Sequence, residues 1–131
     1  TQAPNHAIQV DFPEDFPIVM ADETRLSQVI SNLISNAIKY SSDGEIAISG
    51  QVKPNQVVVC VSDQGPGIAP DDIPHIFDRF YRAPEMARQT KGAGLGLYLA
   101  RSIIEAHGGR IWVAPKPGNN GARICFSIPR Q

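Results

Sequence analysis

The sequence predicts an α+β domain in which two amphipathic helices cover one face of a mostly antiparallel sheet. Two stretches carry apolar residues at the three-to-four spacing of a helix. Around them lie segments of β-type composition, and two pairs of these are close enough in sequence to form hairpins. The chain has 131 residues, 42% of them hydrophobic and 19% charged, which suits one domain with its own core. We therefore expect residues 1–131 to form a single domain.

The first part of the chain is predicted to contain two short strands and a long helix. Alternating polar and apolar residues predict a strand over residues 7–12, and an apolar run predicts another over 18–20. Asp22 stands where a helix N-cap is expected, and residues 41–44 end the helix. The apolar face of this helix consists of Leu26, Val29, Ile30, Leu33, Ile34, Ala37 and Ile38.

The middle of the chain is predicted to be a hairpin followed by a long irregular segment. Strands over residues 45–52 and 57–63 are joined by residues 53–56. Residues 64–94 contain four prolines and only one short helical stretch, near residues 74–81. A loop of this length in a compact domain is usually functional or mobile.

A second helix and a second hairpin complete the predicted fold. Gly108 and Gly109 give this helix its C-terminal stop. Its apolar residues are Leu97, Leu99, Ala100, Ile103 and Ile104. Strands are then expected over residues 110–114 and 122–128, with residues 115–121 as their turn.

Charge and composition argue against several classes of function. With 12 basic and 13 acidic residues the net charge is −1, which disfavours a nucleic-acid or anionic-membrane partner. No apolar stretch is long enough to span a bilayer, and no signal peptide opens the chain. Because the chain begins at Thr1 without a methionine, we expect a fragment of a longer protein.

The two cysteines, Cys60 and Cys125, each lie within an apolar run. We expect two buried structural thiols, and a disulfide is conceivable if their strands are neighbours. Without a close histidine partner, two cysteines do not make a zinc site.

Two polar groups are candidates for ligand binding. Asn32 and Asn36 share one flank of the first helix, and an amide oxygen can bind a hard cation such as Mg²⁺. Taken alone, two solvated asparagines are the simpler interpretation. Asp63 directly follows an apolar strand and precedes Gly65 and Gly67. Its carboxylate would select a donor such as an exocyclic amine, although a plain tight turn explains the pattern as well.

Three glycines, Gly92, Gly94 and Gly96, open the second helix, where backbone amides and the helix dipole favour phosphate. The pattern lacks the strand that precedes a Rossmann fingerprint and the lysine of a P-loop. Nucleotide binding is thus expected by neither of the two commonest routes. The basic residues just before these glycines suit a polyphosphate, or else form a solvated face with packing phenylalanines.

Together, four motifs resemble those of one family. They are Asn-Leu-Ile-Ser-Asn-Ala-Ile-Lys-Tyr-Ser (32–41), Asp-Gln-Gly-Pro-Gly-Ile (63–68), Ile-Phe-Asp-Arg-Phe-Tyr-Arg (76–82) and Gly-Ala-Gly-Leu-Gly-Leu (92–97). In this order they resemble the catalytic and ATP-binding domain of bacterial sensor histidine kinases. That domain belongs to the GHKL superfamily, with gyrase, MutL and Hsp90-type chaperones. The resemblance runs from about residue 8 to residue 129.

The resemblance implies a two-layer α/β sandwich, the Bergerat fold. In it, three helices back a mixed, mostly antiparallel sheet, and a mobile ATP lid covers about residues 68–95. It also implies ATP and Mg²⁺ as cofactors. The residues that it places at the ATP site are Asn32, Asn36, Lys39, Tyr40, Asp63, Gly65, Gly67, Ile68, Phe80, Arg82, Arg88, Lys91, Gly92, Gly94, Leu95, Gly96 and Leu97.

Roles follow by motif match. Asn36 is implied to bind Mg²⁺, and Asp63 to accept the adenine amino group. Asn32, Lys39 and Arg82 make up the implied catalytic group, with Lys39 reaching a phosphate and Arg82 the γ-phosphate. Asn32 stands where ATP-hydrolysing relatives carry a water-activating glutamate, and an amide is not a useful base at neutral pH. That difference favours phosphoryl transfer over hydrolysis.

The lid and the end of the chain carry further implied roles. Phe77 and Phe80 are implied to anchor the lid, Tyr40 to pack near the adenine and Arg88 to face the γ-phosphate, while the three glycines act as hinges. One position departs from the family, because Ala122 follows Gly121 where Thr or Ser is usual. A hydroxyl that could hold a water near the adenine is therefore missing.

The acceptor histidine of the family lies upstream, on a dimerisation helix hairpin. His6, His75 and His107 match no such motif, and we expect them to be surface or capping residues.

The implied function is a kinase module of a two-component system. It would transfer the γ-phosphate of ATP to a histidine on a separate dimerisation domain, for onward transfer to a response regulator. A nucleotide sensor without catalysis, an ATP hydrolase and a serine kinase of the anti-sigma-factor type remain alternatives. The resemblance implies a monomeric, cytoplasmic domain without nucleic-acid or direct membrane contact, whose parent protein can be anchored in the inner membrane.

Overall fold

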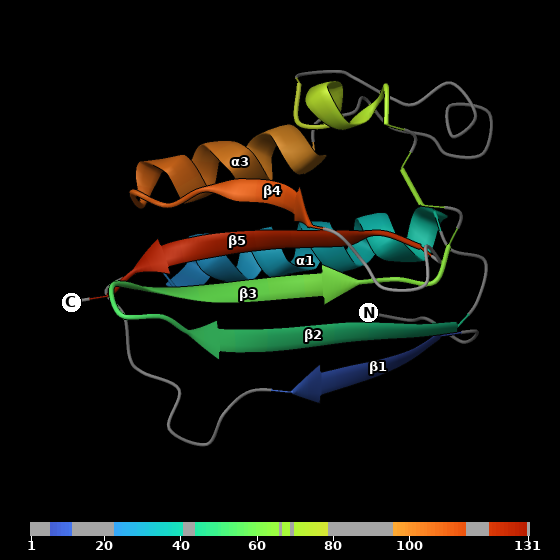
Figure 1. The fold of residues 1–131 in the computed structure, drawn as a ribbon, viewed down its shortest axis with the longest axis horizontal. Helices are drawn as coiled ribbons and strands as arrows, with labels where there is room; N and C mark the ends of the chain where they lie inside the picture. The colour runs from blue at the N-terminus through green and yellow to red at the C-terminus, as the bar shows by residue number, and fades with distance from the viewer. Residues whose placement is uncertain are drawn as a thin grey trace.

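The fold is built on a five-stranded sheet with the strand order β1-β2-β3-β5-β4 (Figure 1). The computed structural model describes residues 6–11, 23–40, 44–65, 67–68, 70–78, 96–114 and 121–130. The strands are β1 (His6–Asp11), β2 (Gly44–Val52), β3 (Gln56–Ser62), β4 (Ile111–Ala114) and β5 (Arg123–Pro129). The helices are α1 (Glu23–Tyr40), α3 (Gly96–Ala106) and a 3₁₀ turn, η1 (Ile73–His75).

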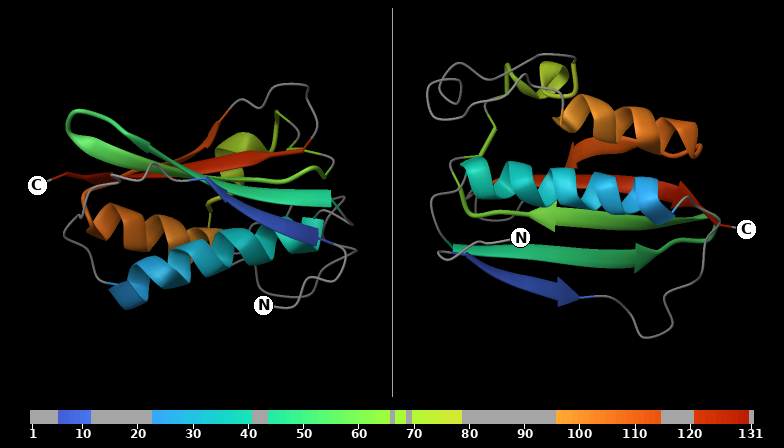
Figure 2. Two further views of the ribbon diagram at one scale, coloured as in Figure 1. Left: turned by 90° about the horizontal axis from the view of Figure 1, so that it is seen from below. Right: turned by 180° about the vertical axis from the view of Figure 1, so that it is seen from behind.

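Strand pairing and helix placement confirm the α+β prediction. β1 runs parallel to β2, whereas β2–β3, β3–β5 and β4–β5 are antiparallel. α1 and α3 lie side by side on the same face of the sheet (Figure 2). Among the described residues, neither α-helix lies on the opposite face, and no helix is long and apolar enough to cross a membrane. The third helix of the expected fold is not found within the described ranges.

The core fills the space between the sheet and the two helices. Side chains alternate between the faces of a strand, so every second residue of β3 and β5 points to the helices. These residues are Val57, Val59, Val61, Ile124, Phe126 and Ile128, and they pack against Val29, Leu33 and Ala37 of α1 and Ala100, Ile103 and Ile104 of α3. The helix residues recur at the spacing that the sequence predicted.

The end of α3 shows why two glycines follow it. Gly109 N donates to Ile104 O (3.0 Å) and Gly108 N donates to Glu105 O (3.0 Å), which is the bonding pattern of a Schellman motif. Gly108 takes the left-handed conformation, with φ +80°. A Cβ atom at Gly109 would overlap the carbonyl oxygen of Ser127 on β5, so only glycine permits this close approach.

Two predictions differ from the structure. The predicted helical stretch near residues 74–81 is a 3₁₀ turn that begins at Ile73 and ends at His75, with the i→i+3 bond His75 N to Asp72 O (2.9 Å). Residues 79–81 and the predicted strand 18–20 lie outside the described residues. The expectation of two thiols is also wrong, because Cys60 and Cys125 form a disulfide. Antiparallel pairing of β3 with β5 sets them directly opposite each other.

Candidate functional site

The candidate residues come from four elements that meet at one end of the molecule. The C-terminal ends of α1 and β3 lie there, together with the first residues of α3 and β5 (Figure 1). Helix α1 packs against α3, and β3 pairs with β5. The fold therefore gathers element ends that are more than 20 residues apart in the sequence.

Asp63 is held in a fixed orientation at the end of β3. Its side chain is buried (8% exposed), and its Oδ1 accepts hydrogen bonds from the backbone N–H groups of Gly65 (2.9 Å) and Ala122 (3.1 Å). Its own N–H donates to Ala122 O (2.9 Å). We call these bonds among Asp63, Gly65 and Ala122 the Asp63 clamp. Backbone donors are rigid, so the clamp fixes the direction in which the carboxylate faces.

Glycines allow the clamp to close. Gly121 has φ +87°, and a Cβ atom there would overlap Asp63 O and approach Gln64 Cα to 2.8 Å. Gly67 has φ +84°, and a Cβ atom there would lie 3.1 Å from Gly121 O. Both residues therefore serve backbone packing at this end of the sheet. For Gly121 and Ala122 the sequence indicated only a missing hydroxyl, so their main-chain role was not foreseen.

Asn32 and Asn36 lie on the flank of α1 and are both partly buried. Asn32 Nδ2 donates to the carbonyl oxygen of Gly96, the first residue of α3, at 3.3 Å. This bond joins the first predicted motif to the last glycine of the fourth. A Cβ atom on Gly96 would meet no heavy atom within 4 Å, so packing does not require glycine at this position.

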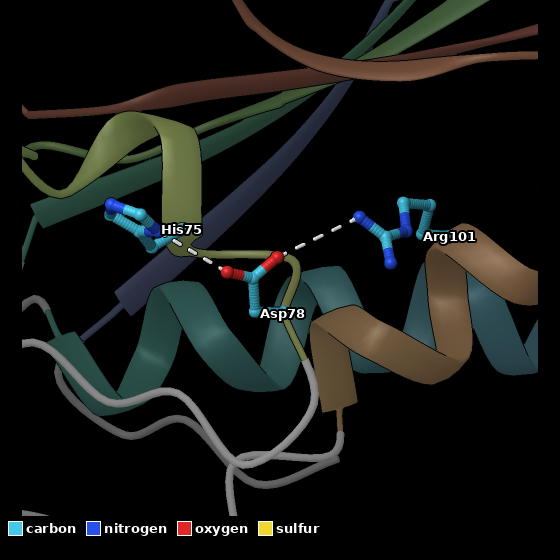
Figure 3. Close-up of polar contacts among 3 residues, drawn as sticks. All are labelled: His75, Asp78 and Arg101. Atoms are coloured by element: carbon cyan, nitrogen blue, oxygen red, sulfur yellow. Dashed lines mark hydrogen bonds and ion pairs between the residues drawn. The ribbon is translucent and has the colours of Figure 1, made fainter.

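The segment that follows Asp63 is attached to the core and to α3. Ile68 and Phe77 are partly buried and pack against the core cluster, which agrees with the anchoring expected of Phe77. Asp78 Oδ2 lies 3.2 Å from His75 Nδ1, and Asp78 Oδ1 lies 4.0 Å from a guanidinium nitrogen of Arg101 (Figure 3). All three side chains are at least about one-third exposed, so these ion pairs add little stability. They do, however, connect the segment around η1 to α3.

The histidines with described side chains behave as expected. The His75 side chain is 56% exposed. The Nδ1 atom of His107 lies 2.8 Å from Ile103 O at the end of α3, which is a capping contact. The side chain of His6 lies outside the description. Arg101, by contrast, was not foreseen, because its partner Asp78 is distant in sequence.

Several predicted site residues lack a described side chain or lie outside the description altogether. Lys39 and Tyr40 end α1, but only their backbone is described. Residues outside the description are Phe80, Arg82, Arg88, Lys91, Gly92, Gly94 and Leu95. Leu97 is described and packs, partly buried, against the core. Within the described part of the chain, no group of three His, Cys, Asp or Glu side chains is placed to hold a metal ion.

Comparison with known proteins gives a family match over most of the chain. The model of the family described as "Histidine kinase-, DNA gyrase B-, and HSP90-like ATPase" matches residues 21–131. The adaptive-response sensory kinase SasA of Prochlorococcus marinus is 44% identical over 124 residues, which cover 93% of this chain and 32% of that protein. The sensor protein KdpD of Clostridium acetobutylicum is 43% identical over 129 residues, or 97% of this chain and 14% of that protein. The chain thus spans a third or less of these curated relatives.

Solved structures match the fold as well. The catalytic domain of histidine kinase ThkA superposes with a TM-score of 0.82 at 35% identity, covering 96% of this chain and 80% of that one. Full-length ShkA in complex with AMPPNP gives 0.81 at 33% identity, covering 95% of this chain and 25% of that one. ThkA in complex with the response regulator protein TrrA gives 0.78 at 32% identity, covering 97% and 35%.

Proposed function

Because this chain belongs to the catalytic domains of sensor histidine kinases, within the family of histidine kinase-, gyrase B- and HSP90-like ATPases, we propose that it binds Mg²⁺-ATP. It transfers the γ-phosphate to a histidine on a separate dimerisation domain, for onward transfer to a response regulator. The observation that carries this proposal is the Asp63 clamp, which presents a buried carboxylate at the end of β3.

The clamp suits recognition of adenine. A carboxylate only accepts hydrogen bonds, and an exocyclic amine such as that of adenine is a donor. Guanine presents a carbonyl at the same ring position, which would meet the carboxylate as a second acceptor. Backbone donors hold Oδ1 in place, which supports the proposed preference for adenine. Gly65, Gly67 and Ile68 line this part of the proposed site, with Tyr40 near the base.

The donor set of α1 suits a magnesium ion shared with the phosphates. Mg²⁺ is commonly held by one or two protein oxygens together with phosphates and waters. Asn36 offers one amide oxygen on the partly buried flank of α1, one turn after Asn32. When bound, the ion supplies neutralisation of the phosphate charge. Lys39, in the last turn of the same helix, is proposed to reach a phosphate.

Phosphoryl transfer is favoured over hydrolysis because hydrolysis needs a general base to activate water. The proposed site has no such base beside the γ-phosphate. Asn32 donates a hydrogen bond to Gly96 O, so its amide holds the start of α3 and does not activate water. Phosphoryl transfer then relies on positioning and charge, which fits the proposed roles of Lys39 and Arg82.

The remaining proposed contacts come from the lid. We propose that Phe80 anchors the lid, that Arg88 and Lys91 contact the phosphates, and that Gly92 and Gly94 act as hinges. Leu95, Gly96 and Leu97 are also proposed to contact the nucleotide, and a Cβ atom on Gly96, the first residue of α3, would meet no heavy atom within 4 Å.

The relatives support the remaining parts of the proposal. ShkA was solved with the ATP analogue AMPPNP, and ThkA with a response regulator protein. We propose that this chain works likewise, as a cytoplasmic, monomeric module that meets its acceptor histidine on another domain of the parent protein. Anchoring of that parent in the inner membrane is compatible with this arrangement.

Substitution of Asp63 by Asn tests the proposal. The side-chain carbonyl of Asn can still accept the two backbone hydrogen bonds, so the clamp stays closed while an NH₂ group faces the adenine amine. Loss of this charge-assisted bond should weaken ATP binding by about 1.5–3 kcal/mol, or about one to two decades in Kd. Calorimetric titration with ATP and GTP measures both affinity and discrimination.

The exposed Asp71, changed to Asn, is the matched control and should leave both affinities unchanged. Unchanged ATP affinity in a folded Asp63→Asn protein would remove Asp63 from the site.

A further inference from the structure

The Cys60–Cys125 disulfide lies on the face of the sheet away from α1 and α3. Val59 and Val61 belong to the core on the helix side, so Cys60 between them points to the opposite face. The two cysteines are the only ones in the chain, and they are 65 residues apart in sequence. Their Cα atoms lie 4.0 Å apart across the β3–β5 pair. The disulfide therefore joins two strands that no hairpin connects.

The same two strands build the Asp63 clamp. From the disulfide the register runs through Val61 opposite Ile124 and Ser62 opposite Arg123. The next pair is Asp63 and Ala122, which is closed by the hydrogen bonds of the clamp at 2.9 and 3.1 Å. A side-chain bond from Arg123 Nε to Ser62 Oγ (3.1 Å) lies between the two pairs. The disulfide is thus three residue pairs from the clamp along one ladder.

We propose that Cys60 and Cys125 are a thiol–disulfide redox site that sets the affinity of the nucleotide site through the Asp63 clamp. This inference rests on the proposed function, because it assigns regulation to that same site. With the disulfide formed, β3 and β5 cannot separate near their site end, so Asp63 and Ala122 stay paired. With two thiols, the last pairs of the ladder open locally more often, and each opening releases the carboxylate.

The two cysteines differ in solvent exposure, and this difference decides which of them reacts first with a small thiol or disulfide. Cys60 is partly exposed, whereas Cys125 is 2% exposed. On oxidation, the Cys60 thiolate attacks a low-molecular-weight disulfide such as oxidised glutathione, which forms a mixed disulfide and releases one thiol. The Cys125 thiolate then attacks Cys60 Sγ and releases the second thiol. Two protein thiols and one small disulfide thus give one protein disulfide and two small thiols. Reduction by a small thiol runs the same steps in reverse, with first attack at Cys60.

The experiment compares nucleotide affinity and amide exchange of the whole chain after equilibration with oxidised or with reduced glutathione. Calorimetry gives the Kd of Mg²⁺-AMPPNP, and amide hydrogen exchange follows the N–H groups of Asp63, Gly65 and Ala122. We expect the disulfide form to bind the nucleotide at least about threefold more tightly, since the competent clamp is more populated. Exchange at the three amides should also be slower in the disulfide form, because the open population is smaller.

A Cys60→Ser variant is the control, because it removes the redox pair at the more exposed of its two positions. Its affinity and exchange should not respond to the redox buffer. A Cys60→Ser/Cys125→Ala variant repeats the test if the single variant folds poorly. Trp112, the only tryptophan, lies opposite Cys125 on β4, so its fluorescence reports the redox state of the pair without a label.

The outcomes separate this inference from the proposed function. Equal nucleotide affinity in both redox states would overturn the inference, and so would an equal response of the Cys60→Ser variant to the redox buffer. If the chain binds no nucleotide in either state, the proposed function fails. The exchange measurement then still decides whether the disulfide and the clamp are coupled.

Discussion

At the scale of single residues, Asn36 carries the metal-dependent part of the proposal. It lies on the flank of α1 beside the core residues Leu33 and Ala37, and its side chain is only partly buried. Asn36→Ala should therefore leave the fold intact, since truncation opens no large cavity. It should weaken magnesium-dependent ATP binding by at least about tenfold, because Mg²⁺ loses a protein oxygen from a demanding octahedron. ATP titrations across a magnesium series measure this.

Ser35→Ala provides the matched control on the same helix. Ser35 is exposed and adjacent in sequence, and although it lies within the first motif, no role at the site is proposed for it. It should behave as the unmodified chain at every magnesium concentration. If Asn36→Ala does so too, Asn36 is not the metal ligand.

Local features of single residues were predictable from the sequence, whereas contacts between distant residues were not. Asp63 was predicted because its chemistry is local, an acidic residue at a strand end followed by glycines. Its partner Ala122 was not predicted as a hydrogen-bond donor, because the two residues are 59 positions apart and meet only through strand pairing. For the same reason the Asp78–Arg101 contact and the Cys60–Cys125 disulfide could not be deduced with certainty from spacing.

At the scale of elements, the junction between α3 and β5 is the most demanding. A Cβ atom at Gly109 would overlap Ser127 O, at the point where Ser127 N donates to Arg110 O at 2.8 Å. Gly109→Ala should therefore force α3 away from β5 and destabilise the domain by about 2–4 kcal/mol. Urea unfolding followed by circular dichroism gives this free energy.

Gly96→Ala is the control at the opposite end of the same helix. A Cβ atom there meets nothing within 4 Å, so the free energy of unfolding should change by less than about 1 kcal/mol. Equal stability losses in the two variants would contradict the close contact with Ser127 O as the cause of the loss at Gly109.

Individual elements were well predicted because their patterns are local. Helical periodicity predicted α1 and α3, and a short connection between two apolar runs predicted the β2–β3 hairpin, although β3 begins at Gln56, one residue earlier than expected. The order of the strands was not predicted. β5 inserts between β3 and β4, and β1 pairs in parallel with β2, and both arrangements depend on contacts between distant segments. The 3₁₀ turn η1 was misjudged because a proline lies at its start and the segment is too short to show a period.

At the scale of the whole molecule, the residues proposed to bind the nucleotide lie at one end of the fold, and the buried core lies in the middle. The core lies between the sheet and the two helices, while the Asp63 clamp and the Asn32–Gly96 bond lie where strands and helices begin or end. This arrangement lets a site change its contacts without disturbing the core. It also fits a module that receives its acceptor from another domain, because the site end is made of strand and helix termini.

Phosphoryl transfer to a histidine, in place of ATP hydrolysis, is the activity proposed for this domain. The most direct test supplies the chain with a separately produced segment that carries the acceptor histidine, together with Mg²⁺ and ATP labelled in the γ-phosphate. We expect an acid-labile label on the histidine segment, and only slow release of free phosphate by the chain alone, because Asn32 cannot act as a general base. Rapid steady-state release of phosphate without labelling of the segment would contradict it.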